Sequence, residues 1–163
     1  MTTCQKSDGH VILGLDPGSL RTGFGVLKRM GTDIIHLDHG TIVLSGKKMI
    51  SDRLRELALD VSHLVATYKP HHAVVEDVFF FKNPHSALVL GQARGAILAV
   101  LGLNQIMVQT LSPTKVKSLV SGHGRAQKFQ LARMVALELD IQEPTSEDAS
   151  DALALALAYA RSC

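Results

Sequence analysis

The order of the secondary-structure patterns along the chain restricts its fold more than any other feature of the sequence. Three segments rich in β-forming residues come first, and strand and helix patterns then alternate. The expected strands are His10–Leu15, Thr22–Leu27, Ile34–Leu44, Ala73–Val75 and Gln105–Gln109. The expected helices are Leu54–Tyr68, Ser86–Leu101, Thr114–Val120, Gln127–Leu139 and Asp148–Arg161. This order predicts an α/β domain around a mixed sheet, with the first three strands in a meander.

The last of these segments is ambiguous by periodicity, because its LALALA run alternates in the manner of a strand. Alanine is the best helix former and is depleted in strands, and fourteen residues would make a long strand. Pro144, Thr145 and Ser146 precede the segment and supply a stop and an N-cap. We therefore predict a helix here.

The size and composition of the chain suit one globular domain that spans residues 1–163, with residues 1–9 as a disordered tail. Its 46% apolar content is ordinary for a folded domain, which excludes a disordered or fibrous protein. Cys4 and Cys163 lie near the two ends and lack the spacing of a zinc or redox motif. No apolar segment appears long enough for a membrane span, and the first ten residues have no apolar core of a signal peptide. We expect a cytoplasmic protein that does not enter a membrane.

The charges are segregated along the chain, although the net charge is only +2. The 60 residues from Val78 to Leu137 contain no Asp or Glu, and the remainder holds 10 bases and 15 acids. The seven bases of this acid-free stretch are Lys82, Arg94, Lys115, Lys117, Arg125, Lys128 and Arg133. One cluster of bases is usually a solvated surface, but so long a stretch without an acid favours a binding face for a polyanion.

Four carboxylates stand where the predicted elements begin or end. Asp16 closes the first strand and Glu76 the fourth, while Asp148 and Asp151 share one face of the last helix at i and i+3. Each has a plain structural interpretation: a turn residue before Pro-Gly, a solvated strand end, and acids that the helix dipole favours.

Their joint placement favours a site, because ligands of open α/β sheets gather at the carboxyl ends of the strands. If the first and fourth strands are parallel neighbours, the final helix can bring all four carboxylates together. Two such charges about 4 Å apart repel by roughly 4 kcal/mol at an effective dielectric of 20, so the cluster needs protons or cations. All-oxygen ligation suits Mg²⁺ or Mn²⁺. Two such ions beside Lys and Arg side chains suit hydrolysis of a phosphodiester better than simple binding of a nucleic acid.

Four segments, in order and with similar gaps, resemble the RuvC family of bacterial Holliday-junction resolvases. The matching segments are LGLDPGSLRTGFGV (Leu13–Val26), VVEDVFFFKNPHSALVLGQARGAI (Val74–Ile97), SPTKVKSLVSGHGRAQKFQ (Ser112–Gln130) and EDASDALALALAYA (Glu147–Ala160). The resemblance implies a ribonuclease H-like fold, with a five-stranded mixed sheet flanked by helices. It also implies a homodimer that cuts a four-way DNA junction by paired symmetric nicks, leaving 5′-phosphate and 3′-hydroxyl ends. The implied partners are the RuvA and RuvB branch-migration proteins.

The resemblance also assigns roles to individual residues. The metal-binding carboxylates of the family fall on the same four acids, so we expect a Mg²⁺ enzyme, with Mn²⁺ as a substitute and two ions per site. Two DNA-facing lysines fall on Lys117 and Lys128, and an aromatic that stacks near the crossover falls on Phe79. We also expect DNA contacts from the bases Lys115, Arg125 and Arg94 of the acid-free stretch.

Phe79 has two interpretations, since three consecutive Phe residues cannot all enter one core: a dimer contact, or a stacking platform for an unpaired base. We favour stacking, because Phe79 lies three residues after Glu76. Ala87, Gly91 and Gly95 would form a close-packed helix face at or near the dimer contact. Tight backbone turns explain Gly18, Gly23 and Gly25 better than a dinucleotide fingerprint does.

One departure from the family is Asp77, an extra acid where many relatives have an amide. Three other functions compete with resolution of junctions: an actin-like ATPase, because Asp16-x-Gly18 with Gly23 also resembles that phosphate loop; a nuclease acting on RNA or RNA–DNA hybrids; and a junction-binding module without activity. The ATPases need two such domains, and 163 residues supply one.

Overall fold

The computed structural model of the chain describes residues 9–77 and 83–162. The strands are β1 (His10–Asp16), β2 (Arg21–Met30), β3 (Asp33–Val43), β4 (His72–Glu76) and β5 (Met107–Leu111). The helices are α1 (Ile50–Tyr68), α2 (Pro84–Leu103), α3 (Pro113–Ser121), α4 (Lys128–Glu138) and α5 (Glu147–Ser162). Three strands followed by alternating helices and strands confirm the predicted element order.

The five described strands form one mixed sheet in the order β3-β2-β1-β4-β5. The first three pair antiparallel, while β4 pairs parallel with both β1 and β5. Leu15 of β1 lies opposite Val75 of β4, so the next residues, Asp16 and Glu76, reach the same edge of the sheet. The first and fourth strands are thus parallel neighbours, which is the condition that the sequence analysis set for bringing the carboxylates together.

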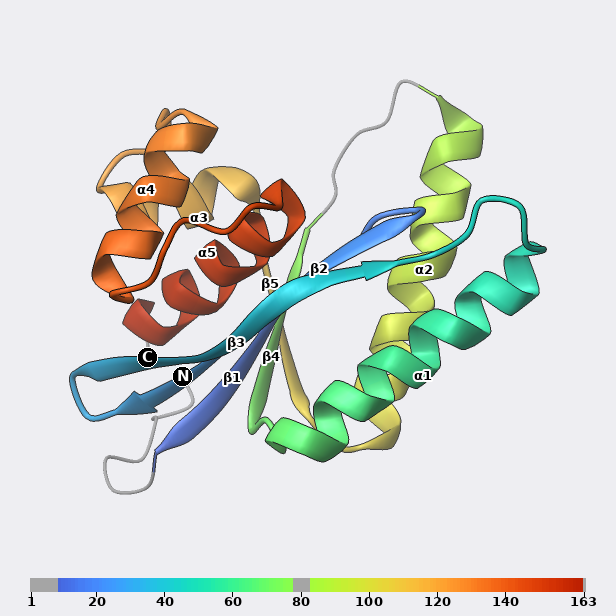
Figure 1. Cartoon of the computed structure of the whole chain (residues 1–163), viewed down its shortest axis with the longest axis horizontal. Helices are drawn as coiled ribbons and strands as arrows, with labels where there is room; N and C mark the ends of the chain where they lie inside the picture. Colours follow the sequence, from blue (N-terminus) through green and yellow to red (C-terminus); the bar gives the residue numbers. More distant parts are fainter. Residues whose placement is uncertain (1–8, 78–82, 163) are drawn as a thin grey trace.

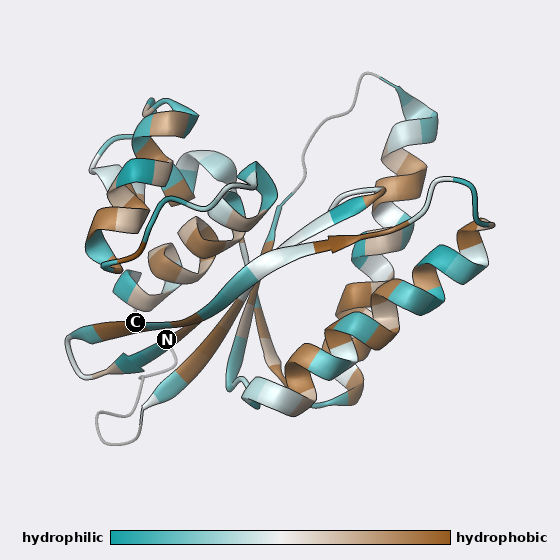
Figure 2. Cartoon of the chain, viewed as in Figure 1, coloured by the Kyte–Doolittle hydropathy of each residue, from teal (hydrophilic) through white to brown (hydrophobic). Residues whose placement is uncertain are grey.

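Helices cover both faces of the sheet (Figure 1): α1 and α2 lie on one side, and α3, α4 and α5 on the other. Successive residues of β1 serve the two faces in turn, since Ile12 packs with Leu153 of α5 while Leu13 packs with Leu57 of α1. Apolar residues accordingly gather where the helices meet the sheet, and the outer side of α1 is largely hydrophilic (Figure 2). Two apolar layers thus hold the sheet in place.

Helix α5 is almost entirely enclosed, which explains its unusual sequence. Ten of its 16 residues are buried, because it packs on the sheet on one side and on α3 and α4 on the other. A helix buried on nearly all sides needs no polar stripe, so LALALA carries no helical periodicity. The predicted helix is confirmed.

Glycines in β1 and β2 allow α5 to lie unusually close to the sheet. A Cβ on Gly23 would stand 1.8 Å from the backbone oxygen of Asp148, and one on Gly14 2.2 Å from that of Ala152. Gly25 likewise faces Leu153 of α5 at 2.8 Å. The prediction that Gly23 and Gly25 serve tight turns was therefore wrong, because both lie inside β2 and make room for the helix.

The last strand lies two residues later than predicted, at Met107–Leu111 and not at Gln105–Gln109. Helix α2 extends to Leu103, and Gln105 has a φ of 56°, a left-handed conformation that no strand contains. The chain therefore turns at Gln105 before the strand can begin.

Helix α2 is, by length and composition alone, apolar enough to cross a membrane, so the expectation that no segment reaches this length was wrong. One face of α2 enters the core through residues such as Ala93, Ile97 and Leu101. Core helices of soluble proteins pass the same test, so this finding alone does not indicate a membrane span.

Candidate active site

Asp16 and Glu76 form the centre of the site, at the carboxyl ends of β1 and β4. Their side chains are hydrogen-bonded to each other, and burial raises the pKa of Asp16 to about 8, with further contributions from Glu76, Asp151 and Asp148. Burial also raises the pKa of Glu76, although the hydrogen bond from Asp16 opposes this shift. The Asp16 carboxyl therefore keeps its proton near neutral pH and donates it to Glu76.

The N-terminal part of α5 supplies the other two carboxylates. Asp148 and Asp151 are three residues apart and face the same side of the helix. The close approach of α5 at Gly23 places them near β1, which pairs Asp16 with Gly23 across the sheet. The structure thus brings all four predicted acids to one end of the sheet.

Two basic side chains compensate the carboxylates of α5. Arg21 Nε lies 2.7 Å from Asp148 Oδ2, and Lys128 Nζ lies 2.9 Å from Asp151 Oδ2 and 4.0 Å from Glu147 Oε2. The hydrogen bond to Asp151 is the largest cause of the raised pKa of Lys128. One shared proton and two cations therefore offset the charge of the four carboxylates.

A short hydrogen-bond chain orients Asp148 from the sheet side. The hydroxyls of Thr41 and Ser146 are 2.7 Å apart, and the Ser146 hydroxyl donates to Asp148 Oδ2 at 3.4 Å. Ser146 directly precedes α5, and its carbonyl accepts the amide of Ser150 at 3.1 Å. Strand β3 and the start of α5 therefore both support this carboxylate.

The donor set fits a hard divalent cation, since all four acids offer carboxylate oxygens and no thiolate or imidazole. Across the described residues, no three acidic, histidine or cysteine side chains are already arranged around a common metal position. Arg21 contacts Oδ2 of Asp148, and Lys128 contacts Oδ2 of Asp151. A divalent cation that binds through these oxygens would compete with the two bases.

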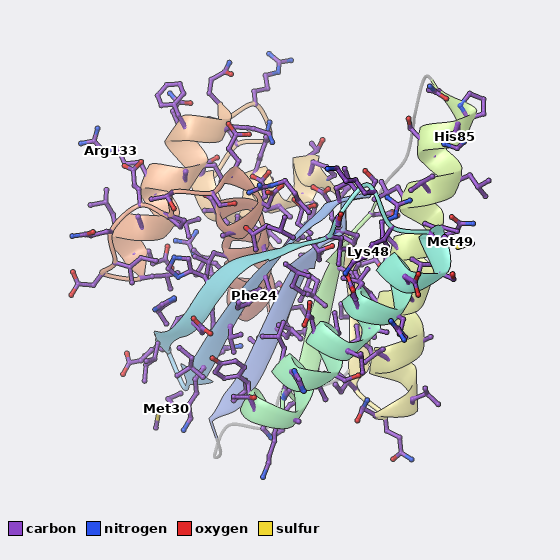
Figure 3. All side chains as sticks on the ribbon, turned by 45° about the vertical axis from the view of Figure 1, so that its right-hand side comes forward. Phe24, Met30, Lys48, Met49, His85 and Arg133 are labelled. Atoms are coloured by element: carbon purple, nitrogen blue, oxygen red, sulfur yellow. The ribbon has the colours of Figure 1, made fainter. Side chains whose placement is uncertain are left out.

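The predicted DNA-contacting bases come from α2, α3, α4 and the loop before α4. Lys115 and Lys117 lie on α3, Arg125 is exposed in the loop before α4, and Lys128 begins α4. Arg94 of α2 donates through Nε to the Glu76 carbonyl at 3.4 Å and through Nη2 to the Thr110 hydroxyl at 3.5 Å. Arg133 projects outward from α4 (Figure 3). Phe79, with Phe80, Phe81 and Lys82, lies outside the described residues.

Sequence reasoning missed Arg21, since 127 residues separate it from Asp148. Its position in the sequence could have indicated a role at the site, because Arg21 begins the strand that follows the Asp16-Pro17-Gly18 turn.

The sequence and the fold were then compared with known proteins. The family described as crossover junction endodeoxyribonuclease RuvC matches residues 12–159. A curated RuvC of Citrifermentans bemidjiense is 42% identical over 152 residues, covering 93% of each chain. One of Idiomarina loihiensis is 40% identical over 156 residues, covering 93% of this chain and 88% of the other.

Solved structures of Holliday junction resolvases also resemble this chain in fold. RuvC of Thermus thermophilus in complex with Holliday junction substrate matches with a TM-score of 0.89 and 30% identity, covering 94% of this chain and 96% of the other. A yeast mitochondrial Holliday junction resolvase, at 13% identity and a TM-score of 0.69, has a similar fold.

Proposed function

Because the chain belongs to the RuvC family of crossover junction endodeoxyribonucleases, we propose that Asp16, Glu76, Asp148 and Asp151 form the active site with which it cuts four-way DNA junctions. The chain is a nuclease of recombination and repair with a ribonuclease H-like fold. The proposed reaction is a pair of symmetric nicks that leave 5′-phosphate and 3′-hydroxyl ends. We propose that residues 1–163 act as one nuclease domain.

The observation that supports this site best is the convergence of four carboxylates from β1, β4 and α5 at one sheet edge, with Arg21 and Lys128 beside them. An acidic cluster alone would repel a phosphodiester. Cations at its rim attract the backbone, and carboxylates at its centre hold the divalent ions that the reaction needs.

The family depends on divalent metal ions, and we propose Mg²⁺, with two ions bound per site and Mn²⁺ as a substitute. Bound ions would activate water and neutralise charge on the phosphoryl group. The chain's own contribution is to position four oxygen ligands and to release a proton from Asp16, whose pKa of about 8 keeps it protonated in the metal-free protein.

The basic residues around the site supply the proposed contacts with the substrate. Lys117 is half-buried on α3, and the Lys128 side chain is 66% exposed beside Asp151. Arg94, Lys115 and Arg125 extend the basic surface on either side. Phosphate contacts of this kind give affinity that falls steeply with salt. Phe79 is proposed to stack on an unpaired base.

We propose that the active unit is a homodimer formed through helix α2. A Cβ on Gly91 or Gly95 would meet nothing within 4 Å, and the neighbouring Leu88 is 61% exposed. Such an apolar face without bulky cover is typical of a protein interface. A two-fold interface would also present two sites to two strands of like polarity. We further propose RuvA and RuvB as partners and the cytoplasm as the location.

The decisive experiment incubates the protein with a synthetic mobile four-way junction, a linear duplex and an RNA–DNA hybrid, with and without Mg²⁺. We expect paired nicks in the junction only when Mg²⁺ is present. Asp16→Asn should abolish nicking and keep junction binding. Equal cleavage of the linear duplex or the hybrid would contradict the proposed substrate, and loss of both binding and nicking in Asp16→Asn would contradict the assigned role.

A further inference from the structure

Arg21 stands at the rim of the carboxylate cluster, and the proposed function gives it no role beyond that of a cation beside the acids. It is the first residue of β2, on the same sheet edge as Asp16, and its Nε contacts Asp148 Oδ2 at 2.7 Å. Its side chain is 54% exposed, against 30% for Asp148. One end of the ion pair therefore faces the solvent from which the substrate approaches.

We propose that Arg21 is a positioning residue that exchanges partners: it pairs with Asp148 in the metal-free protein, and turns to a phosphate of the DNA backbone when a divalent cation takes Asp148. This inference rests on the proposed function of the four carboxylates.

The Asp148 carboxylate keeps a second hydrogen-bond partner when Arg21 leaves. Its Oδ2 also accepts a hydrogen bond from Ser146, which is held in turn by Thr41 of β3. When Arg21 leaves, this chain still orients the carboxylate. The guanidinium is thus a removable partner, whereas Ser146 is a fixed one.

Electrostatics favours the exchange. A guanidinium in direct contact with Asp148 would lie within a few ångströms of a divalent cation bound to the same carboxylate, and like charges so close repel strongly. Arg21 can move, because its side chain is long and half exposed. Lys128 is held by two acids of α5, Asp151 and Glu147, whereas Arg21 pairs with one acid among the described residues, Asp148.

A phosphate of the DNA backbone is a suitable new partner for the Arg21 guanidinium. An arginine fork matches the oxygens of a phosphate as well as those of a carboxylate, and the DNA backbone offers phosphates at this edge of the sheet. Arg21 would then link the two events, metal binding and substrate binding, through one side chain.

The first test measures Mn²⁺ binding to the full chain without DNA, by electron paramagnetic resonance. Arg21→Gln removes the competing cation, so we expect Mn²⁺ to bind about 3- to 10-fold more tightly than to the wild type. Arg21→Lys keeps the charge and should stay within about 2-fold. The matched control is Arg55→Gln, because Arg55 forms an exposed pair with Asp52 on α1, and its Mn²⁺ affinity should not change.

The second test measures junction binding against salt concentration in Ca²⁺. Arg21→Gln should lower the slope of log affinity against log salt by about one, because one phosphate contact is lost. Arg55→Gln should leave the slope unchanged. Circular dichroism melts of all variants establish that they are folded.

The outcomes separate this inference from the proposed site. If Asp148→Asn binds Mn²⁺ as the wild type does, the assignment of the metal ligands fails. If Asp148→Asn loses Mn²⁺ but Arg21→Gln binds it no more tightly than the wild type, only the role of Arg21 is overturned. An unchanged salt slope in Arg21→Gln would also overturn it.

Discussion

The two ends of the sheet carry different clusters of titratable side chains, carboxylates at one end and imidazoles at the other. At the carboxyl ends of β1 and β4, acids are crowded together and depend on a proton, Arg21 and Lys128. At the other end, three imidazoles gather: the His10 ring lies 5.2 Å from that of His71 and 5.7 Å from that of His72.

In the second cluster, the surroundings of His72 favour its neutral form. The amide of Val11 donates to His71 Nδ1 at 3.1 Å, and the Tyr159 hydroxyl of α5 lies 3.1 Å from His72 Nδ1. Burial, His10 and His71 lower the pKa of His72. A neutral His72 ring needs no counter-ion, whereas the carboxylates need protons or cations. A cluster that cannot satisfy itself is the better sign of a functional site.

The largest effect that we expect is a difference in cleavage activity between variants of two neighbouring acids, Glu76 and Asp77. Glu76→Gln should lower junction cleavage by about three orders of magnitude or more, because it removes a ligand charge worth several kcal/mol in the transition state. Asp77→Asn is the matched control and should stay within a few-fold of the wild type. Single-turnover cleavage of a synthetic junction in Mg²⁺ measures both. Equal losses in the two variants would contradict the assignment of Glu76, and not Asp77, as the catalytic acid.

The next effect concerns the support of the site by the backbone. Gly23→Ala would put a Cβ 1.8 Å from the Asp148 carbonyl oxygen, so α5 has to move and take two carboxylates with it. We expect a loss of about 1–3 kcal/mol in the free energy of unfolding, together with loss of cleavage. Gly102→Ala is the control, because a Cβ there meets nothing within 4 Å and alanine favours a helix. A Gly23→Ala protein with normal stability and activity would contradict the proposed support.

Gly23 also illustrates what the sequence reveals and what it conceals. The element order and the four acids at strand and helix ends were predictable, because they depend on local periodicity and chain order. The space at Gly23 was not, because a glycine in a strand looks the same whether it serves a turn or a neighbouring helix. The Arg21–Asp148 pair depends on two residues 127 apart, which no local pattern links.

The two ends should respond to pH with opposite signs, and the acidic end should give the larger response. The raised pKa of Asp16, from 3.8 to about 8, means that the folded state holds a proton that the unfolded state has lost. The free energy of unfolding should therefore fall as the pH rises from about 4 to about 8, by at most about 1.4 kcal/mol per pH unit.

Urea unfolding of the metal-free protein across this range measures the slope. Asp16→Asn cannot ionise and should remove this contribution, so that its stability exceeds that of the wild type most at pH 8. If both proteins had the same pH dependence, the ionisation of Asp16 would not destabilise the fold, and the contrast with the histidine end would fail.

The histidine end should give the smallest effect. Because the pKa of His72 is lowered in the folded state, the unfolded state binds a proton first as the pH falls. Its contribution to stability is present above the ordinary histidine pKa of about 6.5 and is lost as the pH falls through the folded value. The effect is modest, since the ring is only half-buried and can turn toward water. His72→Gln should therefore flatten the acid side of the urea profile, while His63→Gln on the exposed side of α1 leaves it unchanged. An unaltered acid side in His72→Gln would mean that protonation of these rings costs the fold nothing, and the contrast between the two ends would then rest on the carboxylates alone.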